Sequence, residues 1–336
     1  MQFTVIIPAY NAAAFIQEAV DSVMSQKYQS WELIVVDDGS RDDTKRIAEG
    51  FAAADPRVRL ISKKNAGVSA ARNDGLVCAC GDYVFFLDAD DRLEENVMSR
   101  AADQLALLDY RPDIVFGEYD RFDEYTGTGR HCTFDFGSDL CGVYGLGIWN
   151  ILFGKEPMFL APIAAQLYRT AFLQNSHILF DPRLFISEDH DWRYAALAKS
   201  ERYWFAPFSF FTYYNRKIGP PSVTHRPVRF RTVENSHLYL LKWYEAASSD
   251  GALAPVKAVI LGRVAEDYAN KATDISAIQD RQERRQARRL FLQDAGLLKY
   301  ARFRRYRLSN AVLRIFGIRI YLFSIRTANW FRHRVR

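Results

Sequence analysis

The stretch Gly81–Asp91, GDYVFFLDADD, decides the fold and directs the search for a functional site. Tyr83–Leu87 is a short, almost wholly apolar run rich in aromatic residues, which is typical of a strand buried on both faces of a parallel sheet. The run ends in three carboxylates, Asp88, Asp90 and Asp91. This stretch therefore predicts a central strand whose carboxyl end carries a concentrated negative charge.

Two interpretations of these carboxylates remain open. Alternation along an extended chain aims Asp88 and Asp90 to the same side, where two like charges repel unless a cation lies beside them. Because hard ions such as Mg²⁺ prefer carboxylate and phosphate oxygens, the first interpretation is a metal–diphosphate site. The second is an acidic turn in which Asp90 or Asp91 caps the following helix.

Strands and helices alternate on the amino-terminal side of this stretch. The expected strands are Phe3–Ile7, Trp31–Val36 and Arg57–Ile61, and the expected helices are Ala12–Ser25, Thr44–Ala54 and Ala70–Val77. This alternation indicates βαβ units, so we expect an α/β fold with a mostly parallel, Rossmann-like sheet. Ligands bind such sheets beyond the carboxyl ends of the strands, where the polar clusters Asp37–Asp38, Asn65–Arg72 and Asp88–Asp91 should meet.

A nucleotide can be held at this edge without a glycine-rich phosphate loop. Neither a Gly-x-Gly-x-x-Gly pattern nor a Walker loop is present, so a dinucleotide or P-loop site is not expected. Asp38 can accept a hydrogen bond from a base, Tyr10 can lie against the base, and Arg72 can reach a phosphate. Asp38 also fits a turn or cap position and Tyr10 a packed ring, but their shared place at strand ends favours a site.

Four motifs, in this order and spacing, resemble those of the family 2 glycosyltransferases of the GT-A fold. They are VIIPAYNAAAFI, VVDDGSRDDT, NAGVSAARNDGL and GDYVFFLDADD, which cover residues 3 to about 95, with a weaker continuation to about 225. The resemblance implies a GT-A nucleotide-diphospho-sugar transferase fold and an inverting enzyme that uses a nucleotide sugar, usually of uridine.

The resemblance also implies roles for individual residues. The residues expected to contact the nucleotide are Pro8, Ala9, Tyr10, Asp38, Arg72 and Asp88. Asp88 and Asp90 match the family's Asp-x-Asp motif, in which the first residue lies near the ribose. The second residue, Asp90, would bind Mn²⁺ or Mg²⁺ on the diphosphate.

A second acidic cluster lies at Ile186–Trp192, ISEDHDW. Sugar transfer to a hydroxyl needs a base, for which a carboxylate is the usual choice, and Glu188, Asp189 and Asp191 are candidates. A plain acidic first turn that complements a helix dipole is the alternative. By resemblance to the family, Asp189 matches the base and Glu188 an orienting residue or acceptor ligand, with Asp191 as the second choice.

The remaining elements are assigned from their patterns. We expect helices at Glu95–Leu108 and Ala164–Leu173, strands at Asp113–Phe122 and Phe205–Tyr214, and an antiparallel excursion at Thr126–Phe136, while residues 137–162 have no assignment. Arg216 and His225 lie in a segment that resembles the family's closing loop over the diphosphate. They are candidates for phosphate or metal contacts, although a lone histidine is more often only solvated.

The chain is expected to divide near residue 227. Residues 1–227 form the GT-A domain, and residues 228–336 form a helical region with a basic tail and no motif of its own. The three helices expected there are Thr232–Ala247, Pro255–Ala272 and Ile275–Leu292.

Charge is unevenly distributed. The net charge is only +5, but residues 281–336 contain 16 arginines or lysines and only two acidic residues, Glu283 and Asp294. Such a segment, at +14, implies an anionic partner. Its interspersed aromatic residues, among them Phe303, Tyr306 and Trp330, favour an anionic membrane surface. Nucleic acid is not expected, because no fold motif for it accompanies the charge.

We expect a cytoplasmic protein, and the basic tail favours peripheral attachment to the cytoplasmic face of the membrane. The cysteines do not show a zinc spacing and are expected to be reduced; they are Cys78, Cys80, Cys132 and Cys141. The chain opens directly into a strand, so no signal peptide is expected. No run of 18 uncharged apolar residues suggests a spanning helix.

We therefore expect a metal-assisted inverting glycosyltransferase with a single displacement and Asp189 as its base. The donor would be a nucleotide-diphosphate sugar, and the acceptor a hydroxyl of a glycan or lipid-linked glycan. The alternative hypothesis is a non-catalytic module that binds nucleotide sugars or polysaccharide.

Overall fold

The computed structural model describes residues 1–133, 144–153, 162–217 and 228–302. The chain divides into two compact units. The first comprises Met1–Ile151 and Pro157–Thr224, and the second comprises Leu152–Glu156 and His225–Arg336. His225, Cys141 and the tail from residue 303 onward lie outside the described residues, as do most of residues 137–162.

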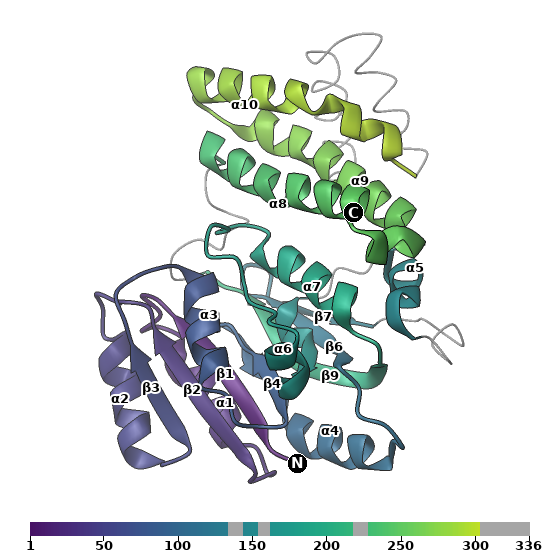
Figure 1. The fold of residues 1–336 in the computed structure, drawn as a ribbon. Coiled ribbons are helices and arrows are strands. Elements are labelled where there is room, and N and C mark those ends of the chain that lie inside the picture. Colours follow the sequence, from purple (N-terminus) through teal and green to yellow (C-terminus); the bar gives the residue numbers. More distant parts are fainter. Residues whose placement is uncertain (134–143, 154–161, 218–227, 303–336) are drawn as a thin grey trace. The chain divides into compact units, whose positions relative to one another are not determined.

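The amino-terminal part of the first unit is a parallel sheet with connecting helices (Figure 1). Its elements are β1 (Phe3–Ala9), α1 (Ile16–Met24), β2 (Trp31–Asp37), α2 (Thr44–Ala54), β3 (Val58–Ser62), α3 (Val68–Val77) and β4 (Tyr83–Phe86). β1 pairs in parallel with both β2 and β4, and β2 pairs in parallel with β3. Every residue of β1, β2 and β4 is buried, which explains their apolar character on both faces.

The second part of the sheet is mixed. Its strands are β5 (Arg92–Leu93), β6 (Ile114–Asp123), β7 (Thr128–Cys132), β8 (Gln166–Arg169) and β9 (Tyr203–Asn215). The strand order is β3-β2-β1-β4-β8-β6-β9-β5, with β7 pairing β6. β8 runs antiparallel to β4 and β6, whereas β6 and β9 are parallel. The expected parallel pairing is thus found among β1 to β4 and again between β6 and β9, whereas the other pairings are antiparallel.

Short helices complete the first unit, and longer ones make up the second. The first unit contains η2 (Gly145–Gly147), η3 (Ile163–Ala165), α4 (Val97–Leu107), α6 (Thr170–Asn175) and α7 (Glu188–Lys199), and α5 (Ile148–Phe153) spans the division. The second unit contains α8 (Phe230–Ser249), η5 (Gly251–Val256), α9 (Lys257–Ala277), α10 (Arg281–Gln293) and η6 (Ala295–Tyr300).

The prediction of a helix at Ala164–Leu173 is wrong. Gln166–Arg169 forms β8, which lies between β4 and β6 and is hydrogen-bonded to both. Leu167 and Tyr168 are fully buried there. A short apolar segment can form either a strand or a buried helix, and in this case the two neighbouring strands decide the outcome.

Two predicted boundaries also change. Pro8 does not end the first strand, because it lies within β1 and pairs with Val36 of β2. The pairing of β1 with β4 ends earlier, at Ile6, so Pro8 is not needed as a hydrogen-bond donor on that side. The predicted helix Ile275–Leu292 is interrupted, since α9 ends at Ala277 and α10 begins at Arg281. Asp280 caps α10 by accepting a hydrogen bond from Glu283 N at 2.7 Å, a cap that the Asp-x-x-Glu pattern could have revealed.

The second unit has its own aromatic core. The rings of Tyr268 in α9 and Phe291 in α10 stack at 4.5 Å between centroids. Ala287, one turn before Phe291, is buried as well. These two residues of α10 pack against the unit, which leaves the opposite face of α10 to solvent.

Two further expectations concern cysteines and membrane spans. Cys78, Cys80 and Cys132 are free thiols. Within the part of the chain that the structure describes, no helix is both long enough and apolar enough to cross a bilayer.

Candidate active site

The three carboxylates after β4 lie in different surroundings. The Asp88 side chain is 42% exposed. Burial, reinforced by the charge of Asp88, raises the pKa of Asp90 to about 6. Asp91 is buried, and burial together with Asp90 and Asp88 raises its pKa well above the usual range. Asp88 and Asp90 are therefore the two partly accessible carboxylates of the three.

Asp91 has a structural role that differs from helix capping. Its Oδ1 accepts a hydrogen bond from Tyr214 N at 3.0 Å, so it joins the turn after β4 to the end of β9. The residue at the cap position of α4 is Asn96. The interpretation of Asp91 as a helix cap is therefore wrong, because its carboxylate is used by a strand distant in sequence.

Arg72 joins the two acidic clusters. It extends from α3, is buried, and donates from Nη2 to Asp88 Oδ1 at 2.7 Å and from Nη1 to Glu188 Oε1 at 3.2 Å. Burial alone would lower the pKa of Arg72, but Asp88 and Glu188 outweigh it and raise the pKa. Three motifs, from α3, the end of β4 and the start of α7, thus meet at one guanidinium group.

The Glu188–Asp189 pair begins α7, as expected. Burial raises the pKa of Glu188, and the nearby charge of Asp189 adds to this effect although Arg72 opposes it. Burial would also raise the pKa of Asp189, but His190, Arg193 and Arg72 outweigh it, so that this pKa is lowered. Asp189 is accordingly an ionised carboxylate at neutral pH.

Asp189 and Asp191 differ in accessibility. The Asp189 side chain is 31% exposed, whereas Asp191 is 1% exposed. An incoming hydroxyl can reach only an accessible carboxylate, so the geometry favours Asp189 over Asp191 as a base.

The expected nucleoside residues lie at the carboxyl ends of β1 and β2. Pro8 and Ala9 are buried at the end of β1, and Tyr10, the next residue, is 46% exposed. The buried carboxylate of Asp38 accepts hydrogen bonds from Ala66 N and Gly67 N, both at 2.8 Å. Each of its oxygens retains a second lone pair, so Asp38 orders the loop before α3 and keeps acceptor capacity.

Gly39 allows this loop to approach β2 closely. It has a φ of +74°, and a Cβ at this position would lie 2.8 Å from Asn65 N. A side chain would therefore strain the backbone and also push the loop away from Asp38.

Two residues of α3 that were not singled out from the sequence hold the segment before α7. Asn73 donates from Nδ2 to Phe180 O at 2.9 Å and accepts from Phe180 N at 2.8 Å. Ser69 donates to Leu184 O at 3.0 Å. Ser69 and Asn73 are four residues apart, with Arg72 between them, and so share a helix face. This spacing of polar residues on one helix face is the pattern by which Ser69 and Asn73 could have been identified from the sequence.

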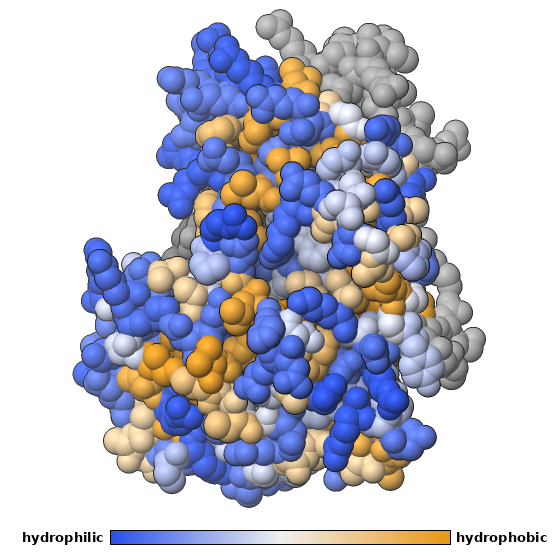
Figure 2. All heavy atoms as spheres, viewed as in Figure 1, coloured by the Kyte–Doolittle hydropathy of each residue, from blue (hydrophilic) through white to orange (hydrophobic). Residues whose placement is uncertain are grey.

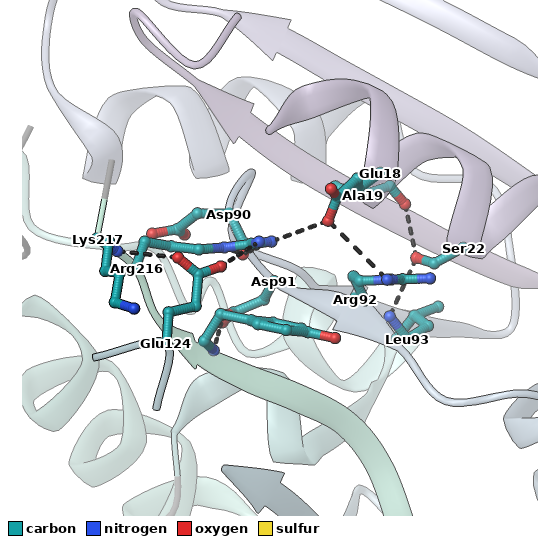
Figure 3. A network of polar contacts seen from close by, with 11 residues as sticks. Glu18, Ala19, Ser22, Asp90, Asp91, Arg92, Leu93, Glu124, Arg216 and Lys217 are labelled. Atoms are coloured by element: carbon teal, nitrogen blue, oxygen red, sulfur yellow. Dashed lines mark hydrogen bonds and ion pairs between the residues drawn. The ribbon is translucent and has the colours of Figure 1, made fainter. Parts of the chain in front are cut away.

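Arg216 does not extend into open solvent. It follows β9, and its guanidinium group contacts the main-chain oxygen of Asp90 together with Glu18 and Glu124 (Figure 3). The sequence suggested a phosphate or metal contact for Arg216 and did not indicate these partners. His225 lies outside the described residues.

A divalent metal fits the donors at the end of β4. Mg²⁺ and similar ions are commonly held by one or two carboxylates together with phosphate oxygens, and Asp88 and Asp90 supply such a pair. Among the described residues, no group of three or more His, Cys, Asp or Glu side chains is arranged to hold an ion. Two carboxylates would leave the other coordination positions of such an ion to further oxygen ligands.

Comparison with solved structures defines the class of fold. The crystal structure of residues 1–349 of S. aureus TarS in complex with UDP-GlcNAc superposes with a TM-score of 0.72, over 98% of this chain and 92% of that chain, at 21% identity. The mannosyltransferase PcManGT from Pyrobaculum calidifontis, in complex with GDP-Man and Mn²⁺, gives a TM-score of 0.53 over 98% of this chain and 87% of that chain, at 19% identity. The fold is of the GT-A glycosyltransferase type.

Sequence comparison identifies the family. The model of glycosyl transferase family 2 matches residues 4–171, half of the chain. The protein therefore belongs to glycosyl transferase family 2, as the motifs predicted.

Curated relatives agree with this assignment. Glycosyltransferase GlyA of Streptococcus pneumoniae is 38% identical over 126 residues, which cover 38% of this chain and 18% of the relative. The uncharacterized glycosyltransferase EpsJ of Bacillus subtilis is 27% identical over 243 residues, which cover 72% of this chain and 67% of the relative. The chain thus spans only a small part of GlyA, and the similarity there concerns the shared region alone.

Proposed function

We propose that the protein is an inverting transferase that moves a sugar from a nucleotide-diphosphate donor, a UDP-sugar, to a hydroxyl group of a glycan or lipid-linked glycan. The observation that carries this proposal is the placement of Arg72 between Asp88 and Glu188. A proposed donor-side carboxylate and a proposed acceptor-side carboxylate are thereby held by the two terminal nitrogens of one guanidinium group.

The donor nucleoside is proposed to lie at the ends of β1 and β2. Pro8, Ala9 and the exposed Tyr10 would contact it, and Asp38 would accept a hydrogen bond from the base. The structural similarity to TarS, which was crystallised with UDP-GlcNAc, supports UDP as the nucleotide. Asp88 would lie on the ribose side, with Arg72 close enough to contact a phosphate as well.

Asp90 is proposed to hold Mn²⁺ or Mg²⁺. When bound, such an ion stabilises the negative charge that grows on the leaving diphosphate. The raised pKa of Asp90 supports this role, because a half-buried carboxylate beside the negative charge of Asp88 is stabilised by a cation. The Mn²⁺ in the complex of PcManGT with GDP-Man offers further support.

Asp189 is proposed to accept the proton of the incoming hydroxyl. Its lowered pKa keeps it ionised, and its side chain is accessible. Glu188, bound to Arg72, would orient the acceptor or hold Asp189 in place. A single base without an enzyme nucleophile implies one displacement and hence inversion of the anomeric centre.

The decisive test measures release of nucleoside diphosphate across a panel of nucleotide sugars, with and without Mn²⁺ and with glycan acceptors. Asp189→Asn should lower transfer about 10²- to 10⁴-fold, because it removes the base, and should leave UDP affinity unchanged. Asp90→Asn should abolish the stimulation by Mn²⁺.

Asp191→Asn is the matched comparison for the base. If Asp191→Asn removed transfer while Asp189→Asn kept near-normal rates, the assignment of the base would be wrong. The alternative of a non-catalytic binding module would be supported only if the donor bound without any release of diphosphate, whereas membership of a glycosyltransferase family favours the enzyme.

We further propose that residues 1–227 are the catalytic domain and that residues 228–336 attach it to the cytoplasmic face of the membrane. Arg281, Arg285 and Arg289 recur every four residues along α10 and are exposed. Ion pairs to these three guanidinium groups do not occur among the described residues. Glu283, the only acid of α10, pairs with Arg229 at 3.4 Å.

The exposed face of α10 therefore offers uncompensated positive charge, and the face in view over α10 is mostly hydrophilic (Figure 2). An anionic lipid surface complements such a stripe. Attachment to a membrane would bring the enzyme to lipid-linked glycan acceptors.

A further inference from the structure

The main-chain oxygen of Asp90 is held by an arginine from the far end of the sheet. Arg216 follows β9 and donates to Asp90 O from Nε at 3.0 Å and from Nη2 at 2.8 Å. Two donors of one planar guanidinium group converging on a single oxygen restrict its position in two directions. The contact uses the carbonyl group and leaves the Asp90 carboxylate to another ligand.

Arg216 is itself anchored from several elements (Figure 3). Its Nη1 donates to Glu124 Oε1 at 2.9 Å, and its Nη2 donates to Glu18 Oε2 at 3.2 Å. The guanidinium carbon lies 4.1 Å from the ring centroid of Tyr214 and 5.0 Å from that of Phe15. The side chain is only 10% exposed, so these contacts are largely shielded from water.

Glu124 also connects Arg216 to its own strand end. While one Glu124 oxygen accepts from Arg216, the other accepts from Lys217 N at 2.9 Å. A carboxylate that binds both a side chain and the next main-chain amide restricts the rotamer of Arg216. The guanidinium is thus held in place before it reaches Asp90.

The end of β9 contacts two successive residues of the acidic turn. Tyr214 N binds the carboxylate of Asp91, and two residues later Arg216 binds the carbonyl of Asp90. Both contacts come from the same backbone segment, so the turn cannot shift relative to β9 without breaking both. These two contacts hold the main chain of Asp90 in place relative to the end of β9.

The number of donors argues against a direct phosphate contact. An arginine has five N–H donors, and Arg216 uses four of them on Asp90, Glu124 and Glu18. With one N–H of Nη1 left over, a diphosphate could be bound bidentately only by displacing at least one of these partners. The sequence had suggested Arg216 as a phosphate or metal contact, and its observed partners suggest a different role.

We propose that Arg216 is a positioning residue, which orients Asp90 for the metal through the Asp90 main-chain oxygen rather than by contact with the donor. This inference rests on the proposed role of Asp90 as a metal ligand. Residues that orient metal ligands are worth about 10- to 100-fold in metal affinity. Arg216 should therefore govern the affinity for the metal and not that for the nucleotide.

The test compares Mn²⁺ affinity in the presence of UDP, followed by electron paramagnetic resonance of free Mn²⁺, with UDP affinity in EDTA, followed by calorimetry. Arg216→Gln should weaken Mn²⁺ binding about 10- to 100-fold and leave UDP affinity in EDTA within about twofold of the parent. Arg216→Lys should recover only part of the loss, because an ammonium group cannot place two donors in a fixed fork.

Arg92→Gln is the matched control. Arg92 lies 3.9 Å from the same Glu18 carboxylate and does not contact the Asp90 carbonyl, so its substitution should leave Mn²⁺ affinity unchanged. Glu124→Gln keeps Arg216 but removes an ionic anchor, and it should weaken Mn²⁺ binding less than Arg216→Gln does. If Arg216→Gln fails to fold, the Mn²⁺ affinity of Glu124→Gln tests the proposal in its place.

Three results would overturn the inference. Unchanged Mn²⁺ affinity in Arg216→Gln, or in Glu124→Gln if only that variant folds, would show that the carbonyl contact does not matter for the metal. An equal loss of UDP affinity in EDTA would identify Arg216 as a direct phosphate ligand. Failure of the parent protein to bind Mn²⁺ with UDP would refute the metal role of Asp90 in the proposed function, and the inference would fall with it.

Discussion

At the scale of single residues, Arg72 is the centre of the site. Its buried guanidinium group donates to Glu188 from Nη1 and to Asp88 from Nη2. Without Arg72, the largely buried Glu188 carboxylate would lose its ion-pair partner. An uncompensated buried charge destabilises the fold more than a buried ion pair does. Arg72 therefore supports the fold and the proposed chemistry together.

Arg72→Gln should lower the free energy of unfolding by about 2 kcal/mol, less than for a fully buried pair because Asp88 is partly exposed. Adding Glu188→Gln should restore part of this loss, because no buried carboxylate is then left uncompensated. Urea denaturation of the single and double variants measures both effects. Strict additivity of the two substitutions would contradict the proposed coupling.

His131 provides a pH-dependent contact away from this site. Its hydrogen bond to Asp120 at 2.8 Å, assisted by Glu118, raises its pKa. A histidine whose pKa is raised on folding contributes stability that is complete below its unfolded pKa of about 6.5 and is lost as the pH rises through the folded value. Because the side chain is 47% exposed, the effect should stay below about 1 kcal/mol.

The titration of His131 followed by NMR should accordingly show a midpoint above that of a free histidine. Asp120→Asn should move the midpoint down, whereas Glu124→Gln, at a carboxylate that does not contact His131, should leave it in place. A midpoint unaffected by Asp120→Asn would show that the contact is not formed in solution.

At the scale of elements, α3 positions the start of α7. Ser69 and Asn73 bind main-chain groups at Leu184 and Phe180, in the segment that leads to Glu188. Arg72, on the same face of α3, then binds Glu188 itself. One helix face thus connects the proposed donor side to the proposed acceptor side.

Asn73→Ala should cost about 1–2 kcal/mol of stability, because two hydrogen bonds to the main chain of Phe180 are lost. It should also lower kcat more than it affects UDP affinity, since it loosens the segment before Asp189. The adjacent Asp74→Asn, which affects only an ion pair with Lys63, is the control. Equal effects of the two substitutions on kcat would contradict this role of α3.

At the scale of the whole molecule, the chain comprises two units with unequal charge. The first contains the proposed catalytic residues, and the second leads into the segment 281–336, whose net charge is +14. Exposed arginines of α10 supply three of these charges without paired acids among the described residues.

Full-length protein should float with vesicles of phosphatidylglycerol and phosphatidylcholine, and not with phosphatidylcholine alone. At about 1 kcal/mol per arginine, replacing Arg281, Arg285 and Arg289 by Gln should weaken binding about 100-fold at low salt. The triple variant Lys27→Gln, Lys45→Gln and Arg46→Gln removes equal charge from the first unit and should bind normally. Equal loss in both variants would indicate a nonspecific charge effect.

The hydrophobic periodicity and the turn residues were sufficient to predict the strands and helices of the first part of the fold. Strands β1, β2 and β4 are buried along their whole length and therefore mostly apolar, and their short lengths distinguish them from helices. β8 was not predictable in this way, because its four residues form a strand only through pairing with β4 and β6. The same limit applies to the parallel pairing of β6 with β9, which depends on contacts distant in sequence.

The sequence by itself determined the family, the order of the first motifs and the residue types near the site, because these depend on local pattern and spacing. Only the tertiary structure decided how the three carboxylates of Asp88–Asp91 differ. Asp91 binds β9, the carbonyl of Asp90 binds Arg216, and Asp88 binds Arg72. Adjacent residues of one type take different roles because partners from distant segments give each its own burial, charge and hydrogen bonds.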